Sequence, residues 1–487
     1  LDFNTSPPTP LLNGQLNTYE GCTSIADKDG NLLFYSDGVT VYNKNHEVME
    51  NGDGLAGDPS GSQSGVIVPH PSTQDLYYIF TVGMPQDPFS FSLVDMNINN
   101  GLGKVTVKNT RLLFSATEKV TAVQKSDGSG FWIISYASDF NKIGYYIFDL
   151  SEGGLNETPV YFPVEREGFD RGYIKVSPYG DILAAAFQQR GNFESYIQLF
   201  HFDDSNGQIL ESIFLSIFPR DRRYKGGDGP YGIEFSPNGK FLYVSERTPY
   251  NGNPNGTFNR IFQYDISVLE NDAIEASRVV LDSIISRQVG GLQLGPDGKI
   301  YLAIHESDSL GVINFPDRKG VAAGYERNGI YLGGRKSQQG LPTFNQSLFR
   351  QMEIEFDNEC FNDATSFTFL SNIENIENVI WGFGDPTSGS NSATGTVTHH
   401  QFSSSGEFSV SASVTFDGQT RTITRPVIIN PSPDLSLGTD SIYTSELTRD
   451  YNLNTNGQTY IWNDGSTEAT KTLTSPGWHW VEATTEQ

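Results

Sequence analysis

The histidines and acidic clusters are the side chains of this sequence that could hold a metal ion, and their spacing argues against one. The seven histidines are scattered, and none belongs to an HExxH motif or pairs with a cysteine at zinc-ligand spacing. His399 and His400 are adjacent on an expected strand, where successive side chains point to opposite faces, so they could not readily chelate one ion. The string DKDGN at 27–31 lacks the alternating acidic positions and distal Glu of a calcium loop. We therefore expect neither a metal nor a cofactor.

Two strings resemble parts of known enzymes. KSDGSGFW at 125–132 is similar to the Asp-box of sialidases, but Ser126 and Asp127 are wrongly spaced and the string occurs once. SPNGKFLYVS at 236–245 resembles strands of lactonase-type propellers, although Pro-Asn-Gly-Lys is also simply a good hairpin sequence. We therefore predict no catalytic residue and no enzymatic activity. A propeller hydrolase or lactonase with a central-channel active site is the alternative.

Residues 14–350 contain a repeated structural unit, and its strands and turns must position any functional site. The unit is a short apolar strand, a Gly-containing turn and a strand rich in β-branched and aromatic residues. Its six copies begin at Cys22, Gly65, Thr121, Tyr173, Gly232 and Gly291. The turn glycines of the last four copies are Gly128, Gly180, Gly239 and Gly298. Their separations of 52, 59 and 59 residues suit the four-stranded blade of a β-propeller.

A ring of blades must close to hide the edges of its sheets, and the expected seventh blade is composite. LPTFNQSLF at 341–349 would supply a first strand and LDFN at 1–4 the outer strands. The sequence thus predicts an all-β chain whose first domain, residues 1–350, is a seven-bladed β-propeller closed by its N- and C-terminal strands. A six-bladed ring is the alternative.

Propellers place ligands where loops of several blades converge at the mouth of the central channel, which the residues beginning each first strand line. Our candidate binding residues for this mouth are Glu20, Gln63, Tyr231, Gln293 and Gln339. The alternative is that they are polar loop residues with no ligand.

Residues 351–432 change to short alternating strands. VIWGFGDP at 379–386 and HHQFSSSGEFSVSASVTFDG at 399–418 resemble the two motifs of the PKD domain, a small Ig-like β-sandwich. The matching residues are Trp381, Phe383, Gly384, Asp385, Phe402, Gly406, Phe408 and Val410. Phe replaces Tyr twice, and Pro386 stands where the family usually has Gly, so the turn after Asp385 must differ. Trp381 is expected in the core.

Residues 433–487 predict a second Ig-like β-sandwich. LSLGTDS at 435–441, YIWNDGSTE at 460–468 and SPGWHWVEA at 475–483 resemble the Ig-like repeat of large Bacteroidetes surface proteins. We expect Trp478 and Trp480 to be core or sandwich-edge residues rather than a ligand platform, although ligand contact stays open.

The chain as a whole resembles secreted Bacteroidetes proteins that carry a gliding-motility-associated C-terminal sorting domain. The residues that carry the likeness are 16–49, 62–71, 230–246 and 340–347. The resemblance implies export across the outer membrane by type IX secretion and a place at the cell surface or outside the cell. It implies an interaction or adhesion protein that binds a protein or glycan through its propeller loops. Its partners would be outer-membrane secretion or motility proteins, or surface glycans.

Charge and hydrophobicity exclude other partners. The net charge of −26 repels nucleic acid and anionic lipid. No run of about 18 apolar residues occurs, so we expect no direct membrane insertion. The chain starts at Leu1 without a signal sequence, and we expect a mature or excised piece.

Two kinds of covalent modification can also be considered. A disulfide between Cys22 and Cys360 would have to join two domains, so we expect two buried thiols instead. Asp-Ser-hydrophobic triplets at Ser283, Ser309 and Ser441 resemble the O-glycosylation signal of Bacteroidetes surface proteins. Ser309, which we expect in a loop, is the best candidate.

Overall fold

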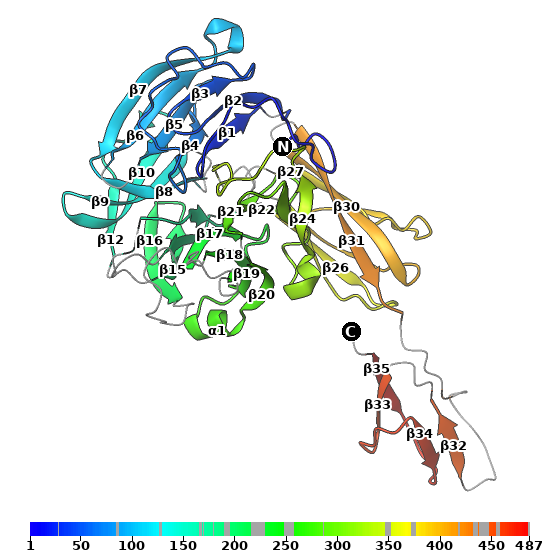
Figure 1. Cartoon of the computed structure of the whole chain (residues 1–487). Helices are drawn as coiled ribbons and strands as arrows, with labels where there is room; N and C mark the ends of the chain where they lie inside the picture. The colour runs from blue at the N-terminus through cyan, green and yellow to red at the C-terminus, as the bar shows by residue number, and fades with distance from the viewer. Residues whose placement is uncertain are drawn as a thin grey trace. The chain divides into compact units, whose positions relative to one another are not determined.

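The computed structural model divides into two compact units, residues 1–351 and 352–487, called unit 1 and unit 2 below. It describes every residue except 28, 84–86, 126–128, 165–167, 169, 179, 189–194, 216–228, 248–257, 286, 346–351, 372–375, 417–418, 432–436, 438–447, 454–457 and 486–487. The helical elements of the described residues are η1 (Asn99–Gly101), α1 (Asn271–Ala276) and η2 (Gly320–Ala323). Nearly all other regular structure is β-strand (Figure 1), as the sequence predicted.

Six antiparallel sheets follow one another along the described part of unit 1, each made of strands that are consecutive in sequence. The first three are β1 (Thr23–Ala26), β2 (Leu32–Ser36) and β3 (Val41–Asn43); β4 (Gly65–Pro69), β5 (Leu76–Val82), β6 (Phe89–Asp95) and β7 (Lys104–Leu113); and β8 (Ala116–Gln124), β9 (Phe131–Asp139), β10 (Lys142–Ser151), β11 (Gly154–Leu155) and β12 (Val160–Pro163).

The next three sheets have four strands each. They are β13 (Ile174–Val176), β14 (Ile182–Phe187), β15 (Tyr196–Asp203) and β16 (Gln208–Leu215); β17 (Gly229–Phe235), β18 (Phe241–Arg247), β19 (Phe258–Asp265) and β20 (Val279–Ile285); and β21 (Val289–Leu294), β22 (Ile300–Ile304), β23 (Ser309–Ile313) and β24 (Tyr325–Tyr331). The repeat found in the sequence is therefore the first hairpin of each sheet.

The Gly-containing hairpin turns hold more than two residues. In the fifth sheet, the amide of Ser236 donates to the Phe241 carbonyl (2.8 Å) and closes a loop formed by the residues between them. Gly239 within that loop has a φ of 68°, which a residue with a side chain rarely adopts. The glycine is thus required by this wider turn.

Consecutive sheets pack face to face through their first strands. β17 is buried at every position, whereas β20, the last strand of the same sheet, is largely exposed or half-buried. Apolar clusters join each sheet to the next along the chain. Figure 1 shows the sheets in this order, from blue through cyan to green. The arrangement is that of a β-propeller-like fold with its first strands innermost.

The ends of unit 1 meet at a seam between the first and sixth sheets. Residues 339–343, the seam segment, run between β21 and the start of β1. The amide of Gly291 donates to the Gln339 carbonyl (2.8 Å), and the amides of Gln339 and Thr343 donate to the carbonyls of Tyr19 (2.9 Å) and Cys22 (2.8 Å). The seam segment pairs with the first sheet through one isolated parallel bridge, Cys22 with Pro342, and no seventh sheet occurs among the described residues. Residues 346–349 of the expected strand lie outside them.

Two sheets of unit 2 share one apolar core. They are β25 (Glu353–Asp357), β26 (Thr365–Leu370) and β29 (Val397–His400), and β28 (Ser392–Thr394), β27 (Ile376–Gly382), β30 (Gly406–Phe416) and β31 (Gln419–Ile429). Trp381 lies in this core, as predicted, together with Phe383 and Phe402. His400 is buried and stacks on Phe383, while His399 is exposed, so the two rings do point apart.

The remaining strands of unit 2 form two pairs, β32 (Arg449–Asn452) with β34 (Thr470–Leu473) and β33 (Gln458–Trp462) with β35 (Val481–Thr485). Trp462 is their buried tryptophan. Trp478 and Trp480 were expected to be core or sandwich-edge residues; they are 88% and 54% exposed, so neither lies in the core. Both precede β35, and the amide of Asn463, just after β33, donates to the Trp480 carbonyl (3.0 Å), which places Trp480 at the end of that strand pair. The predicted division of unit 2 at residue 433 stays a prediction.

Both cysteines are free thiols. Cys22 is buried, and burial raises the pKa of its thiol to about 12, which makes it unreactive near neutral pH. Cys360 is exposed, contrary to the expectation of two buried thiols, because it lies just outside the strands of the sandwich.

Candidate functional site

The first strands of unit 1 bury charged side chains, which proteins rarely do unless the charges are paired. The buried charged residues on or beside these strands include Glu20, Glu118, Lys119, Lys175, Glu234 and Arg247. Because the first strands are innermost, these side chains converge on the axis of the ring. Apart from Lys119, which adjoins the second group, they fall into two groups, one midway along the axis and one at the end where the first strands begin.

The group midway along the axis is an ion pair with a shared amide. Lys175 Nζ on β13 donates to Glu234 Oε2 on β17 (2.7 Å) and to Gln293 Oε1 on β21 (2.5 Å). Glu234 also accepts from the amides of Leu294 (2.8 Å) and Phe235 (3.0 Å). Burial lowers the pKa of Lys175, an effect that the Glu234 carboxylate opposes. This axial triad of Lys175, Glu234 and Gln293 ties three sheets together and is inaccessible to solvent.

The second group lies where the first strands begin, and we call it the mouth cluster. It consists of Glu20, Ser62, Glu118, Arg171, Tyr231 and Arg247. β17 pairs with β18 so that Gly229 lies opposite Arg247, which brings the end of a second strand to the same edge as the starts of the first strands. Residues from five of the six sheets, or from the segments that lead into them, therefore meet here.

Glu118 is the acidic centre of the mouth cluster. Its Oε2 accepts from the amide and the hydroxyl of Ser62, both at 2.8 Å, and its Oε1 lies 3.7 Å from Arg171 Nε. Burial raises the pKa of Glu118, the nearby charge of Glu20 raises it further, and the Ser62 hydrogen bonds oppose both. Arg171 is partly exposed, so solvent reaches this side of the cluster. A carboxyl with a raised pKa is a better proton acceptor than an ordinary carboxylate.

Arg247 and Tyr231 supply the donors of the mouth cluster. Arg247 Nη1 lies 3.3 Å from Glu20 Oε1, its Nε donates to the Val289 carbonyl (2.9 Å), and its guanidinium stands 3.1 Å from the centre of the Tyr231 ring. Arg247 Nη2 is buried and has no hydrogen-bond partner among the described residues, and the Tyr231 hydroxyl, also buried, lies beside Ser62. Burial, and then Glu20, raise the pKa of Tyr231 well above its usual range, so it stays a donor. One buried donor, Arg247 Nη2, is thus left for a ligand oxygen.

Lys119 adjoins Glu118 on β8 and is equally buried. Its Nζ donates to the Asp170 carbonyl (2.7 Å) and stands 4.6 Å from the centre of the Phe187 ring. Burial lowers the pKa of Lys119 to about 7, although Asp170 and Glu118 oppose the effect.

The structure brings two of the five predicted mouth residues together. Glu20 and Tyr231 both flank Arg247 in the mouth cluster. Gln293 lies deeper, in the axial triad. All five are buried, so none is an exposed loop residue.

Gln63 and Gln339 hold the backbone of neighbouring elements. The Gln63 amide pairs with the backbone of Ile174, donating to its carbonyl (3.1 Å) and accepting from its amide (2.8 Å). Gln339 Nε2 donates to the Tyr19 hydroxyl (2.7 Å) and to Gln288 Oε1 (2.6 Å) at the seam. Both side chains have their polar atoms engaged in joining sheets.

The sequence analysis missed six residues of these two groups: Ser62, Glu118, Arg171, Lys175, Glu234 and Arg247. The signal that could have found three of them is a charge inside an otherwise apolar first strand, as in YIKVS and GIEFS. Arg247 ends a second strand, and only the pairing of β17 with β18 brings it to the mouth.

The predicted glycosylation serines differ in accessibility. Ser309 begins β23 and is buried, so the expectation of a loop is wrong; the strand pairs with β24 from this residue onward. Ser283 is exposed on β20, and Ser441 lies outside the described residues.

Within the described part of the chain, no group of three or more His, Cys, Asp or Glu side chains is arranged to hold a metal ion. No described helix is long and apolar enough to span a bilayer.

No family model matches the chain. A curated relative, the uncharacterized protein YwcC of Lactococcus lactis subsp. lactis (strain IL1403), is 30% identical over 113 residues, which are 22% of this chain and 31% of the relative. The chain thus matches less than a third of the length of that relative.

Several solved structures resemble the chain. The Pseudomonas aeruginosa periplasmic gluconolactonase PpgL is 12% identical, with a TM-score of 0.38, over 84% of this chain and 99% of its own. A glucose dehydrogenase is 12% identical, with a TM-score of 0.34, over 60% and 95%. The calcium-binding protein regucalcin of Agrobacterium tumefaciens strain C58 is 13% identical, with a TM-score of 0.32, over 69% and 94%. These likenesses concern the fold alone.

The comparisons correct the prediction that this protein is not an enzyme. The structures that it resembles include a gluconolactonase and a glucose dehydrogenase, so the fold gives no reason to exclude catalysis. The prediction that the protein has no enzymatic activity is therefore wrong; it rested only on the lack of a known catalytic motif.

Proposed function

We propose that unit 1 is a six-bladed propeller that hydrolyses small esters or lactones at the mouth cluster. The observation that carries this proposal is a buried donor without a partner among the described residues, Arg247 Nη2, in the same cluster as the buried Tyr231 hydroxyl and a carboxyl of raised pKa, Glu118. A buried donor without an acceptor costs about 1–3 kcal/mol, which an oxygen of a bound substrate would remove.

The chemistry follows from these groups. An ester carbonyl oxygen would accept from Tyr231 and Arg247, whose donors stabilise the negative charge that develops as water attacks the carbonyl carbon. Glu118 would take a proton from that water and return it to the leaving alkoxide when the carbon–oxygen bond breaks. Ser62 fixes the orientation of the Glu118 carboxyl through its two hydrogen bonds.

The test is a pH-indicator assay of the full chain against a panel of short-chain esters and δ-lactones. We expect turnover by the wild type and a loss of about 100-fold or more in Glu118→Gln, because general acid–base catalysis contributes that much. Glu152→Gln, at an exposed site, is the matched control and should retain full activity. No turnover of any substrate, or equal rates for the wild type and Glu118→Gln, would refute the proposal.

A second function, surface interaction, is supported by the exposed tryptophans of unit 2. We propose that the chain is an exported cell-surface protein, that unit 2 comprises a PKD domain and a further Ig-like sandwich, and that Trp478 and Trp480 contact a glycan. Exposed aromatic rings of this size are enriched at binding surfaces. On a glycan array, Trp478→Ala combined with Trp480→Ala should abolish binding, whereas Ile461→Ala, also exposed, should not. Equal binding by all three proteins would exclude the tryptophans.

A further inference from the structure

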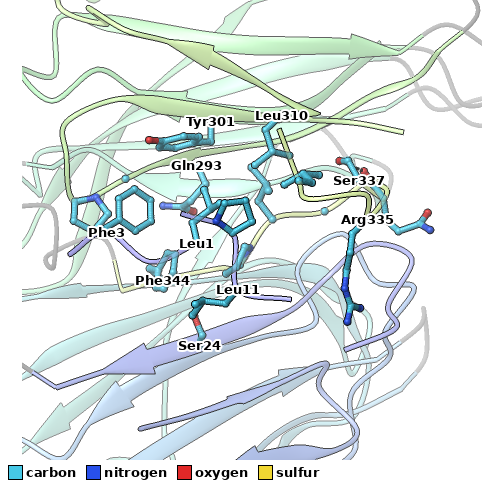
Figure 2. A pocket seen from close by; sticks show the side chains of 18 of the residues that line it. Leu1, Phe3, Leu11, Ser24, Gln293, Tyr301, Leu310, Arg335, Ser337 and Phe344 are labelled. Carbon is cyan, nitrogen blue, oxygen red and sulfur yellow. Dashed lines mark hydrogen bonds between the residues drawn. The ribbon is translucent and has the colours of Figure 1, made fainter. Parts of the chain in front are cut away.

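A cavity of about 340 Å³ lies beside the seam of unit 1, where the N-terminal residues pass over the first and sixth sheets. Figure 2 shows Phe3 and Leu11 of the N-terminal segment facing Tyr301 and Leu310 of the sixth sheet, with Phe344 closing the other side. We call it the seam pocket. Its volume is at the lower end of the range for ligand sites, and no residue of the mouth cluster lines it.

The charged residues of the seam pocket favour an anion. Of its 21 lining residues two are basic, Arg335 and Lys336, and none is acidic. The chain as a whole has the opposite balance, with 58 acidic and 32 basic residues. Arg335 Nη2 donates to the Leu12 carbonyl, which holds its guanidinium at the pocket, and Lys336 is exposed. An anionic group would therefore be attracted here and repelled by most of the remaining surface.

The seam pocket also holds an acceptor without a donor. Gln338 Oε1 is buried, and no described residue donates to it. Gln293, which lines the pocket toward the ring axis, already accepts from Lys175 (2.5 Å). A ligand hydroxyl would satisfy Gln338, while the apolar walls would hold a hydrocarbon chain.

We propose that the seam pocket binds a medium-chain hydroxycarboxylate. Its carboxylate lies at Arg335 and Lys336, its hydroxyl donates to Gln338, and its alkyl chain lies between the N-terminal segment and the sixth sheet. This site is separate from the mouth cluster, so it does not depend on hydrolysis at Glu118.

The test is calorimetric titration of the full chain with three probes that share a tail: β-hydroxydecanoate, decanoate and decylammonium. We expect β-hydroxydecanoate to bind about fivefold more tightly than decanoate, because one hydrogen bond to a buried acceptor is worth roughly this ratio. Decylammonium should not bind measurably. Equal binding of decanoate and decylammonium, or no binding of any probe, would overturn the proposal.

Two variants separate the charge from the hydroxyl. Lys336→Glu should weaken β-hydroxydecanoate about tenfold, whereas Lys44→Glu, an exposed lysine outside the pocket, should leave the affinity unchanged. Gln338→Leu should remove the preference for the hydroxyl, so that both carboxylates bind alike. Unchanged affinity in Lys336→Glu, or a preference that survives Gln338→Leu in a protein with wild-type melting, contradicts the assignment.

Discussion

Removing the lysine of the axial triad tests how the sheets of unit 1 are held together. In Lys175→Met the apolar stem is kept, but the donor that lies 2.7 Å from Glu234 and 2.5 Å from Gln293 is lost. Glu234 then remains a fully buried carboxylate with only backbone donors. Breaking a buried ion pair on one side destabilises proteins by about 3–5 kcal/mol, and we expect a loss in this range.

The assay must report unit 1 separately from unit 2. Urea unfolding followed by hydrogen exchange and mass spectrometry does so, because peptides from β13, β17 and β21 are read individually. The double variant Lys175→Met with Glu234→Gln removes both charges and keeps an acceptor for the Leu294 amide. We expect it to recover about 2 kcal/mol or more relative to Lys175→Met.

Two results would refute this reasoning. A loss below about 1 kcal/mol in Lys175→Met would mean that solvent or a neighbour compensates Glu234. Additive losses in the double variant would mean that the two side chains do not interact in solution.

Three further predictions concern other parts of the chain. Gly340→Ala should destabilise unit 1 by about 3 kcal/mol in urea unfolding, because a Cβ there would overlap the Glu20 carbonyl; a neutral result would mean that the seam relaxes. Phe140→Asn should raise the free energy of unfolding by about 0.5–1 kcal/mol, because Phe140 has a φ of 46° and the residue is 74% exposed, and this gain should exceed the loss of its edge contact with the Phe114 ring. Burial raises the pKa of Asp385, but hydrogen bonds from Ser403 and His400 hold it below its usual range. Stability of the first sandwich of unit 2 should therefore be present above about pH 4 and fall as the pH drops further, and Asp385→Asn should remove this dependence in pH-resolved melting.

The repeat could be read from the sequence because it is local. Each copy predicted an apolar strand, a turn glycine and a second strand, and the hairpins β13–β14, β17–β18 and β21–β22 are those copies. This pattern involves only residues close together in the sequence, so it can be recognised without knowing how the rest of the chain folds.

Features that depend on distant pairing could not be read in this way. The seam segment was expected to begin a seventh blade, but its partners lie some 320 residues away, at Tyr19 and Cys22. Tryptophan is a common core residue type, so the sequence alone does not distinguish Trp478 and Trp480 from Trp462. Only the pairing of β33 with β35 shows that Trp462 is the buried one.

The candidate site was partly predictable for the same reason. The rule that first strands begin at the channel mouth placed Glu20 and Tyr231 near each other. It could not select Arg247, because the position of that side chain depends on the register of β18, nor show that Gln63 is engaged by the backbone of Ile174.

The closure of the ring by residues 339–343 sets the order in which unit 1 can be completed. The first sheet is synthesised long before its partner on this side, because the Thr23 hydroxyl donates to the carbonyl of Thr343, which lies 320 residues later in the chain. Until then the edge of β1 has no neighbour on that side and the axis is open to water. A chain halted before the seam segment would therefore present a bare edge to proteases and to other nascent chains.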